Sequence, residues 1–301
     1  MNFAHLHRDG YGYGSARALA QAQRLYTLGV RQMALNPFGY MRSTTTPEVL
    51  WGGDHSLTDE QLVTQIAQLQ ELGFEVMLKP HLWAWSYLGG SGNMDLTFDA
   101  AGWKAWFASY TRFARHYAQI AEQTGCSCFC IGLEFTGASK ANPGAWAKVA
   151  DQCRDLYRGR VGYAANWYEE FEIFADWDAF DWMGVNAYFP LAGSTVEELA
   201  ASWKPHLDKI EAVAKGKPVL FAEAGYRAVA KTTETPWDAD GTPDDGLQAR
   251  AYEALFRACT ERPWFRGVYW WKWFTDLPGE NDSFVPADRP AERVMAAWYG
   301  A

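Results

Sequence analysis

The sequence contains no long apolar segment. Nowhere in its 301 residues do about 18 apolar residues follow one another without a charge, although a membrane-spanning helix requires a stretch of that length. A secretory signal places a basic stretch before an apolar one, and the opening segment MNFAHLHRDGYGYGS has no such order. We therefore expect no transmembrane helix and a cytoplasmic location for the chain as given, with secretion after removal of a signal as the alternative.

Positive charge is also in short supply. Lys and Arg together number 27, against 36 Asp and Glu, which gives a formal net charge of −9 at pH 7. An acidic surface repels the phosphate groups of nucleic acids and of anionic lipids. We therefore expect neither a nucleic acid nor a membrane among the partners. The oligomeric state has no signature in the sequence.

Cysteine is scarce, and motifs for metals or nucleotides are absent. The five cysteines include no C-x-x-C pair, and Cys126, Cys128 and Cys130 alternate along one predicted strand, where neighbours on one face rarely suit a disulfide. We expect buried free thiols in a reducing compartment. The histidines form no H-E-x-x-H motif, and neither a G-x-G-x-x-G after a strand nor a G-x-x-x-x-G-K-[ST] loop occurs. We therefore predict no metal and no cofactor.

Aromatic residues, in contrast, are abundant. The chain has 16 Trp, 15 Tyr and 17 Phe, which together make up 16% of its residues. Packing of a core does not usually require so many tryptophans. Trp and Tyr offer large flat apolar faces with a polar edge, a combination that suits the ring of a sugar. An oligosaccharide or polysaccharide is therefore the first ligand class to consider.

Hydrophobic periodicity predicts eight strands, each followed by a helix. The predicted strands span residues 2–5, 30–36, 74–81, 127–134, 161–166, 182–188, 218–223 and 267–272. The predicted helices span residues 15–28, 58–72, 102–122, 143–157, 169–174, 196–214, 246–259 and 291–298. Such alternation is typical of a closed parallel barrel. We therefore predict an α/β fold with one domain over residues 1–301, a (β/α)8 TIM barrel, rather than an open doubly wound sheet, whose nucleotide-binding motif is missing.

Polar and aromatic side chains lie where seven of the predicted strands end. They are Asn36, His81, Glu134, Asn166, Asn186 with Tyr188, Glu223 and the segment 271–273. In a (β/α)8 barrel the carboxyl ends of all strands meet at one face, and the loops of that face build the active site. The long connections at residues 37–57, 83–100, 224–245 and 273–290 belong to the same face.

Two of these strand ends carry a glutamate. Glu134 alternates with small residues such as Cys130, so we expect it to point into the barrel mouth, and we expect Glu223 to share an inward face with Phe221 and Val219. Two carboxylates at one barrel mouth are typical of glycoside hydrolysis, in which one is the general acid and the other the nucleophile. Their spacing along the chain does not assign the roles. A purely structural pair under the loops is the alternative.

Motifs at several strand ends together resemble one enzyme family. They are K-P-H at residues 79–81, I-G-L-E-F at 131–135, Y-A-A-N-W at 163–167, V-N-A-Y at 185–188, F-A-E-A-G-Y at 221–226 and W-W-K-W at 270–273. The chain resembles the clan A glycoside hydrolases, and within them family 113, the β-mannanases. The resemblance implies a retaining hydrolase of β-1,4-mannosidic bonds that works by double displacement, with Glu134 as acid/base and Glu223 as nucleophile. Leu133 stands where many clan A members have Asn.

Further roles follow as hypotheses from these positions. We expect Tyr188 to donate its hydroxyl to Glu223 and to keep that carboxylate oriented. We expect His81, Asn166 and Asn186 to hydrogen-bond the hydroxyls of the reacting sugar.

The aromatic strand ends are candidates for sugar platforms. Trp271 and Trp273 share one face of the last predicted strand by alternation, so either is a candidate for the floor under the reacting ring. The candidates for outer subsites, which lie in or beside the loops after strands, are Trp83, Trp85, Trp167 and Tyr226.

Three functions stay open at the level of sequence. The first is a retaining hydrolase that acts on mannan or manno-oligosaccharides, and the second is the same fold acting on another β-glycan, since loops rather than the fold choose a substrate. The third is a sugar-binding barrel without activity. The joint presence of Glu134 and Glu223 disfavours the third.

Overall fold

The computed structural model describes residues 1–53, 57–84, 96–238, 240–277 and 282–300. Its main sheet contains nine parallel strands in the order β10-β9-β8-β7-β6-β4-β2-β1-β11. These are β1 (Asn2–Ala4), β2 (Gln32–Leu35), β4 (Glu75–Leu78), β6 (Cys128–Leu133), β7 (Arg160–Asn166), β8 (Trp182–Asn186), β9 (Val219–Ala224), β10 (Phe265–Trp270) and β11 (Trp273–Phe274).

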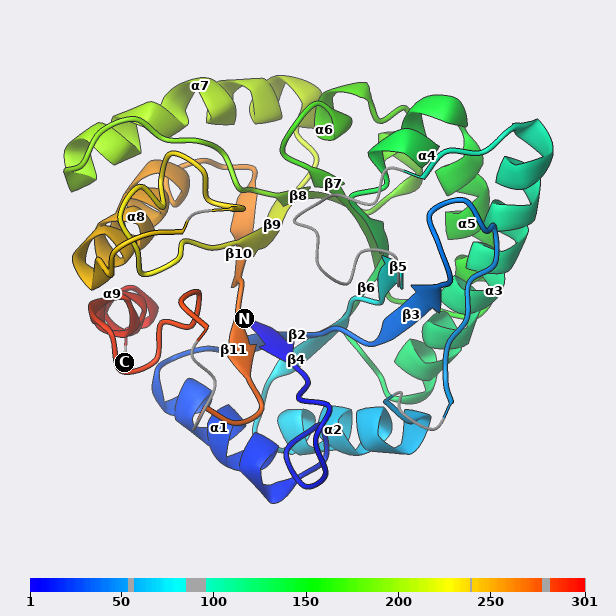
Figure 1. Ribbon diagram of the computed structural model, residues 1–301, viewed down its shortest axis with the longest axis horizontal. Helices are drawn as coiled ribbons and strands as arrows, with labels where there is room; N and C mark the ends of the chain where they lie inside the picture. The colour runs from blue at the N-terminus through cyan, green and yellow to red at the C-terminus, as the bar shows by residue number, and fades with distance from the viewer. Residues whose placement is uncertain (54–56, 85–95, 239, 278–281, 301) are drawn as a thin grey trace.

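The sheet curves round into a barrel (Figure 1). Its two end strands, β10 and β11, are consecutive in the chain and are separated only by residues 271–272. β10 pairs with β9, and β11 pairs with β1, where Phe3 lies opposite Trp273. β10 and β11 together therefore occupy the eighth strand position, and the predicted (β/α)8 barrel is confirmed.

Helices surround the strands on the outside (Figure 1). They are α1 (Ala16–Thr27), α2 (Asp59–Glu71), α3 (Ala100–Gln123), α4 (Thr136–Ala141), α5 (Ala145–Arg154), α6 (Glu170–Ile173), the 3₁₀ turn η2 (Trp177–Ala179), α7 (Val196–Ala214), α8 (Asp245–Cys259) and α9 (Pro290–Tyr299). Each of the eight predicted helices has a counterpart, with ends shifted by a few residues.

Capping residues explain where several helices begin. Ser15 accepts a hydrogen bond from the backbone N–H of Ala18 at the start of α1. Thr58 and Gln61 form a reciprocal capping box at the start of α2. Each cap satisfies backbone donors that the first helical turn leaves unpaired, a contribution of about 1 kcal/mol.

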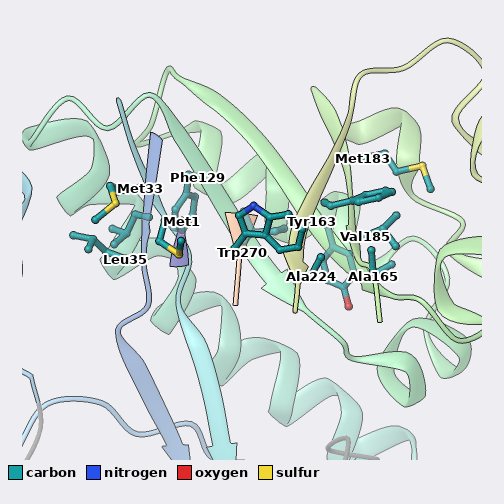
Figure 2. Close-up of a cluster of buried hydrophobic side chains, with 14 of the residues drawn as sticks. Met1, Met33, Leu35, Phe129, Tyr163, Ala165, Met183, Val185, Ala224 and Trp270 are labelled. Atoms are coloured by element: carbon teal, nitrogen blue, oxygen red, sulfur yellow. The ribbon is translucent and has the colours of Figure 1, made fainter. Parts of the chain in front are cut away.

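Two apolar layers hold the barrel together. Small and medium side chains such as Ala34, Met77 and Ala164 fill the interior of the barrel. A larger cluster lies between the strands and the helices, and Figure 2 shows part of it around Phe129 and Val185. The strands are consequently covered on both faces, as in other parallel sheets, and polar groups are left to the strand ends.

Strand β6 departs from simple alternation just before its end. Cys130 and Leu133 face the barrel interior, whereas Ile131 packs in the outer layer, and a Cβ on Gly132 would meet side chains of α3 and α5. Two consecutive residues therefore face outward, and the pairing of β6 with β7 shifts register at this point. Glu134 follows with a φ of 56°. The predicted inward direction of Glu134 holds, but a bulge and a left-handed residue produce it rather than continuous alternation.

Strand β9 has a second irregularity. Leu220 and Ala222 face the barrel interior, and Val219 and Phe221 pack in the outer layer. The prediction that Glu223 shares an inward face with Val219 and Phe221 was therefore wrong. The register of β9 against β8 shifts just before Glu223, so that this side chain turns toward the barrel mouth although alternation would direct it outward.

A small second sheet lies at the mouth of the barrel. β3 (Phe38–Met41) pairs in parallel with β5 (His81–Ala84), and Phe38 lies opposite His81. Both segments follow strands of the barrel and belong to stretches that the sequence analysis treated as strand ends and loops. They extend the barrel wall above β2 and β4.

The remaining sequence expectations concern isolated groups. The five cysteines are free and buried. None of the helices in the described residues has the length and apolar character that crossing a bilayer requires. Within the same residues, no cluster of three or more His, Cys, Asp or Glu side chains could hold a metal ion.

Candidate active site

A cleft of about 640 Å³ opens at the carboxyl ends of the strands. Its lining residues are Phe38, His81, Trp83, Glu134, Asn166, Trp167, Tyr168, Tyr188, Glu223, Trp237, Trp271 and Phe284. The two glutamates of the sequence analysis therefore face one cavity. Aromatic rings form most of the remaining wall.

Glu223, at the end of β9, has three polar side chains around its carboxylate. Its Oε1 forms a close ion pair with the ammonium group of Lys79. The same oxygen lies 3.5 Å from Nε2 of His81. The Tyr188 hydroxyl donates to Oε2 at 3.0 Å, the contact that the sequence predicted. The carboxylate is thus oriented on both oxygens and faces a positive charge.

Lys79 is the main residue that the sequence analysis missed. It directly follows β4, and its side chain is fully buried. Lysines are almost never fully buried unless they are paired, so a lysine at the end of an apolar strand is itself a signal. The K-P-H segment at residues 79–81 contains that signal. The ammonium group also lies 5.5 Å from the ring centroid of Trp271.

Glu134 has a different electrostatic environment. Burial raises the pKa of Glu134 to about 8, and the negative charge of Glu223 adds to the increase. The Asn186 amide opposes this shift, although no direct hydrogen bond of ordinary geometry satisfies that amide in the structure. Glu134 therefore keeps its proton at neutral pH and is suited to donate it. Asn186 is fully buried beside Glu134 rather than in the cleft wall.

His81 and Trp271 form one side of the cleft. Their rings stack with centroids 5.7 Å apart, and the ring of Phe38 lies 5.1 Å from His81 on another side. Burial, followed by the nearby charge of Lys79, lowers the pKa of His81 well below its usual value. The imidazole is therefore neutral and can both donate and accept a hydrogen bond. Trp271 offers the flat surface beside Glu223 that a sugar ring requires.

Trp273 was wrongly predicted as an alternative floor for the sugar. Its side chain is fully buried, and its indole N–H donates to Gln21 of α1 at 2.9 Å, so it packs on the outside of the barrel. The prediction assumed continuous alternation from Trp271 to Trp273. The eighth strand is interrupted at residues 271–272, so the two rings lie on different sides of it.

Tyr226 was wrongly predicted as an outer subsite. The side chain is fully buried, and its ring lies 6.4 Å from that of Tyr252 in α8. It follows β9 in the chain, but it turns under the loop instead of into the cleft. Trp83 and Trp167 do line the cleft. Trp85 lies outside the described residues.

Asn166 connects the cleft to a buried carboxylate. Its side chain faces the cleft, and its backbone N–H donates to Oε2 of Glu170 at 2.8 Å. Oε1 of Glu170 accepts hydrogen bonds from the hydroxyls of Tyr163, at 2.6 Å, and Ser139, at 2.8 Å. Tyr163 in turn accepts from the backbone N–H of Phe135, next to Glu134. Glu170 therefore ties together the backbone segments that carry Glu134 and Asn166.

Four more cleft residues were not predicted. They are Phe38, Tyr168, Trp237 and Phe284. Phe38 belongs to the unpredicted strand β3, Tyr168 lies in the short connection between β7 and α6, and Trp237 and Phe284 lie in the long connections after β9 and β11.

Comparison with known proteins agrees with this geometry. The model of Glycoside Hydrolase Family 113 matches residues 1–288. A GH113 β-1,4-mannanase, solved as a complex, is 28% identical in sequence and has a TM-score of 0.87. The match covers 100% of this chain and 98% of the mannanase chain. The GH113 β-mannanase AaManA from Alicyclobacillus acidocaldarius, in complex with ManMIm, is also 28% identical and has a TM-score of 0.88. This match covers 100% of the chain described here and 96% of AaManA.

More distant structures share the fold alone. A β-glucuronidase from Ruminococcus gnavus is 12% identical, with a TM-score of 0.63 over 94% of this chain and 45% of its own. A search of curated protein sequences gave no match.

Proposed function

Because this chain belongs to glycoside hydrolase family 113, we propose that it hydrolyses β-1,4-mannosidic bonds in mannan or manno-oligosaccharides by double displacement, with retention of the anomeric configuration. Family membership makes it a glycoside hydrolase with a carbohydrate substrate, and the sugar and the stereochemistry are the proposal. One observation carries it: a single aromatic cleft holds Glu134, which keeps its proton, and Glu223, which faces an ammonium group.

In the first step, Glu223 acts as the nucleophile. Its carboxylate attacks the anomeric carbon, the bond to the leaving sugar breaks, and the proton of Glu134 moves to the leaving oxygen. The product is a glycosyl ester on Glu223. Tyr188 and Lys79 contact the two oxygens of this carboxylate and so fix the attacking direction.

In the second step, Glu134 acts as the base. It takes a proton from water, the water oxygen attacks the anomeric carbon, and the ester to Glu223 breaks. The charge of Glu223 is one cause of the raised pKa of Glu134. That charge is absent while Glu223 is esterified, so the pKa of Glu134 falls in the intermediate and the carboxylate becomes available as a base.

The cleft chemistry supports a neutral sugar. Among its described lining residues, Glu134 keeps its proton and His81 is neutral at neutral pH, and none is a lysine or an arginine; the nearby ammonium group of Lys79 is already paired with Glu223. A uronic acid would need a cationic partner there, whereas a mannose unit needs hydroxyl contacts and an apolar face. His81, Asn166 and Trp271 provide those contacts. The two similar structures described as β-mannanases support mannan as the glycan.

A polysaccharide panel tests the substrate. Reducing-sugar release is measured from β-mannan, β-glucan and xylan, with Glu134→Gln as the blank. We expect release from mannan. Release from glucan or xylan alone would contradict the choice of mannan, and binding to a glycan without release from any would contradict an enzymatic function.

Azide rescue tests the stereochemistry. In Glu134→Ala, azide can enter the space of the missing carboxyl group and attack the glycosyl ester. We expect a β-mannosyl azide, which two inversions produce from a β-mannoside. An α-mannosyl azide would refute the retaining mechanism. Glu223→Ala is the matched control and should give no azide product by this route, because it cannot form the ester.

A further inference from the structure

Two tryptophans from distant parts of the chain stack at the edge of the cleft. Trp167 directly follows β7, and Trp237 lies in the connection between β9 and α8. Their ring centroids are 5.0 Å apart with an angle of 23° between the planes. Both rings line the cleft that holds Glu134 and Glu223.

The stack is partly open to solvent, because Trp167 is half-buried and Trp237 is exposed. Trp237 is 45% exposed, and Tyr168, whose ring lies edge-on to Trp167 at 5.6 Å, is 63% exposed. A pair that only supported the core would be covered, as the stacked pair of Tyr252 and Trp270 is. Contiguous exposed aromatic rings beside a catalytic cleft indicate a surface that a ligand covers. The three rings offer flat apolar faces, so the ligand that they fit is a neutral pyranose ring, whose C–H face packs on an aromatic face.

The order of the strands places the stack on the leaving-group side. Trp271, which offers the flat surface for the reacting ring, stacks on His81, which follows β4, so the reacting ring lies on that side of the cleft. Glu134 follows β6, which pairs with β4 on one side and with β7 on the other. The acid therefore stands between the reacting ring and Trp167. Since the acid protonates the bridging oxygen, the sugar beyond that oxygen reaches the stack.

We propose that Trp167 and Trp237 form the subsite for the sugar that leaves with the bridging oxygen. This inference rests on the proposed hydrolysis of a β-glycan. Binding energy from a sugar that does not react can be used to lower the activation barrier at the reacting bond. The subsite would consequently accelerate cleavage of oligosaccharides and have no effect on a substrate whose leaving group is too small to reach it.

The test compares two substrates in Trp237→Ala. The first is an oligosaccharide of the glycan that the wild-type enzyme hydrolyses fastest in the panel, and the second is the glycosyl fluoride of the same sugar, which has a leaving group of one atom. We expect kcat/KM on the oligosaccharide to fall about 10- to 100-fold, the effect of one lost substrate contact of moderate strength. We expect kcat/KM on the fluoride to stay within about twofold.

Two control variants separate binding from folding. Trp237→Tyr keeps a flat ring and should recover most of the activity on the oligosaccharide. Trp298→Ala removes a tryptophan that is 37% exposed on α9, which is not part of the cleft, and should change neither substrate's kcat/KM.

The outcomes distinguish this inference from the proposed function. Equal losses on both substrates, or no loss on either, would overturn the subsite while the hydrolase assignment stands. If wild type releases sugar from another glycan but not from mannan, the mannanase proposal is overturned. The comparison of wild type with Trp237→Ala on an oligosaccharide of that other glycan then decides the subsite. Absence of hydrolysis across the whole panel would overturn both.

Discussion

The ion pair between Lys79 and Glu223 is buried deeply enough to contribute measurably to stability. The lysine side chain is fully buried, and the glutamate side chain is 6% exposed. Lys79→Met keeps most of the side-chain volume but removes the ammonium group, so that the Tyr188 hydroxyl and the nearby His81 ring are the contacts of this carboxylate described above that remain. Removal of one partner of a buried pair typically costs about 3–5 kcal/mol. We expect a loss in the lower part of that range, because the tyrosine still donates to the carboxylate.

A double-mutant cycle measures whether the charge is responsible. The free energy of unfolding is obtained from urea denaturation of wild type, Lys79→Met, Glu223→Gln and the double variant. With a neutral glutamine in place of Glu223, loss of the ammonium group no longer leaves a buried charge unpaired. The second substitution should then cost little, and the coupling energy should reach about 2 kcal/mol or more. Equal costs in the two backgrounds would refute the ion-pair argument and leave only a packing role for Lys79.

The same variant also tests catalysis. The ammonium group lies against the nucleophile and fixes the direction of its carboxylate. We expect kcat/KM of Lys79→Met to fall by about 10²–10³-fold, a typical loss for one preorganised electrostatic contact in an active site. Activity close to that of the wild type would show that Glu223 does not depend on the lysine.

Three further predictions concern Glu134 and the tryptophans of the eighth strand. The pKa of Glu134 is raised to about 8, and its proton is needed for the first step, so kcat/KM on an oligosaccharide should fall as pH rises through about 8. A glycosyl fluoride needs little acid assistance and should not show this fall. The pKa of Glu134 is higher in the folded protein than its value of 4.5 in the unfolded chain, so its contribution to stability is present below pH 4.5 and is lost as pH rises through about 8. Glutamine does not titrate, so Glu134→Gln should gain stability relative to wild type over this pH interval, as measured by urea denaturation. A difference in stability that stays constant with pH would contradict this prediction. Trp271→Ala should lower kcat/KM about tenfold or more with little change in unfolding free energy. Trp273→Ala should instead lower the unfolding free energy by about 3–5 kcal/mol, because it creates a cavity. Kinetic and denaturation measurements on both variants test this, and the reverse pattern would contradict the placement of the two rings.

The barrel could be predicted from sequence because its signals are local. The change from strand to helix periodicity, the capping box of Thr58 and Gln61, and glycines after helices all act within a few residues. The strand ends then identify a common face, since every carboxyl end of a parallel barrel lies on the same side. For that reason the sequence predicts that His81, Glu134, Asn166 and Glu223 lie at one face of the barrel, and all four line the same cleft.

What could not be predicted depends on contacts between distant segments. Trp237 belongs to a polar loop with no periodic pattern, and only its stacking on Trp167 places it at the cleft. The sheet of β3 and β5 forms because two loop segments pair with each other. Lys79 was overlooked because a lysine is usually exposed, and its burial becomes apparent only when its partner Glu223 is known to lie opposite.

The wrong predictions at Phe221 and Trp273 have a common physical origin. Both assumed that side chains alternate without interruption along a strand, and both strands are irregular near the cleft. An inward side chain in the middle of a barrel strand meets the packed interior, whereas a catalytic carboxylate needs a position above that interior with access to substrate. β6 and β9 each change register just before their glutamate. Because of these bulges, Leu133 and Ala222 close the apolar interior, and Glu134 and Glu223 turn toward the mouth. The irregularities that make alternation a poor predictor here are therefore the features that build the site.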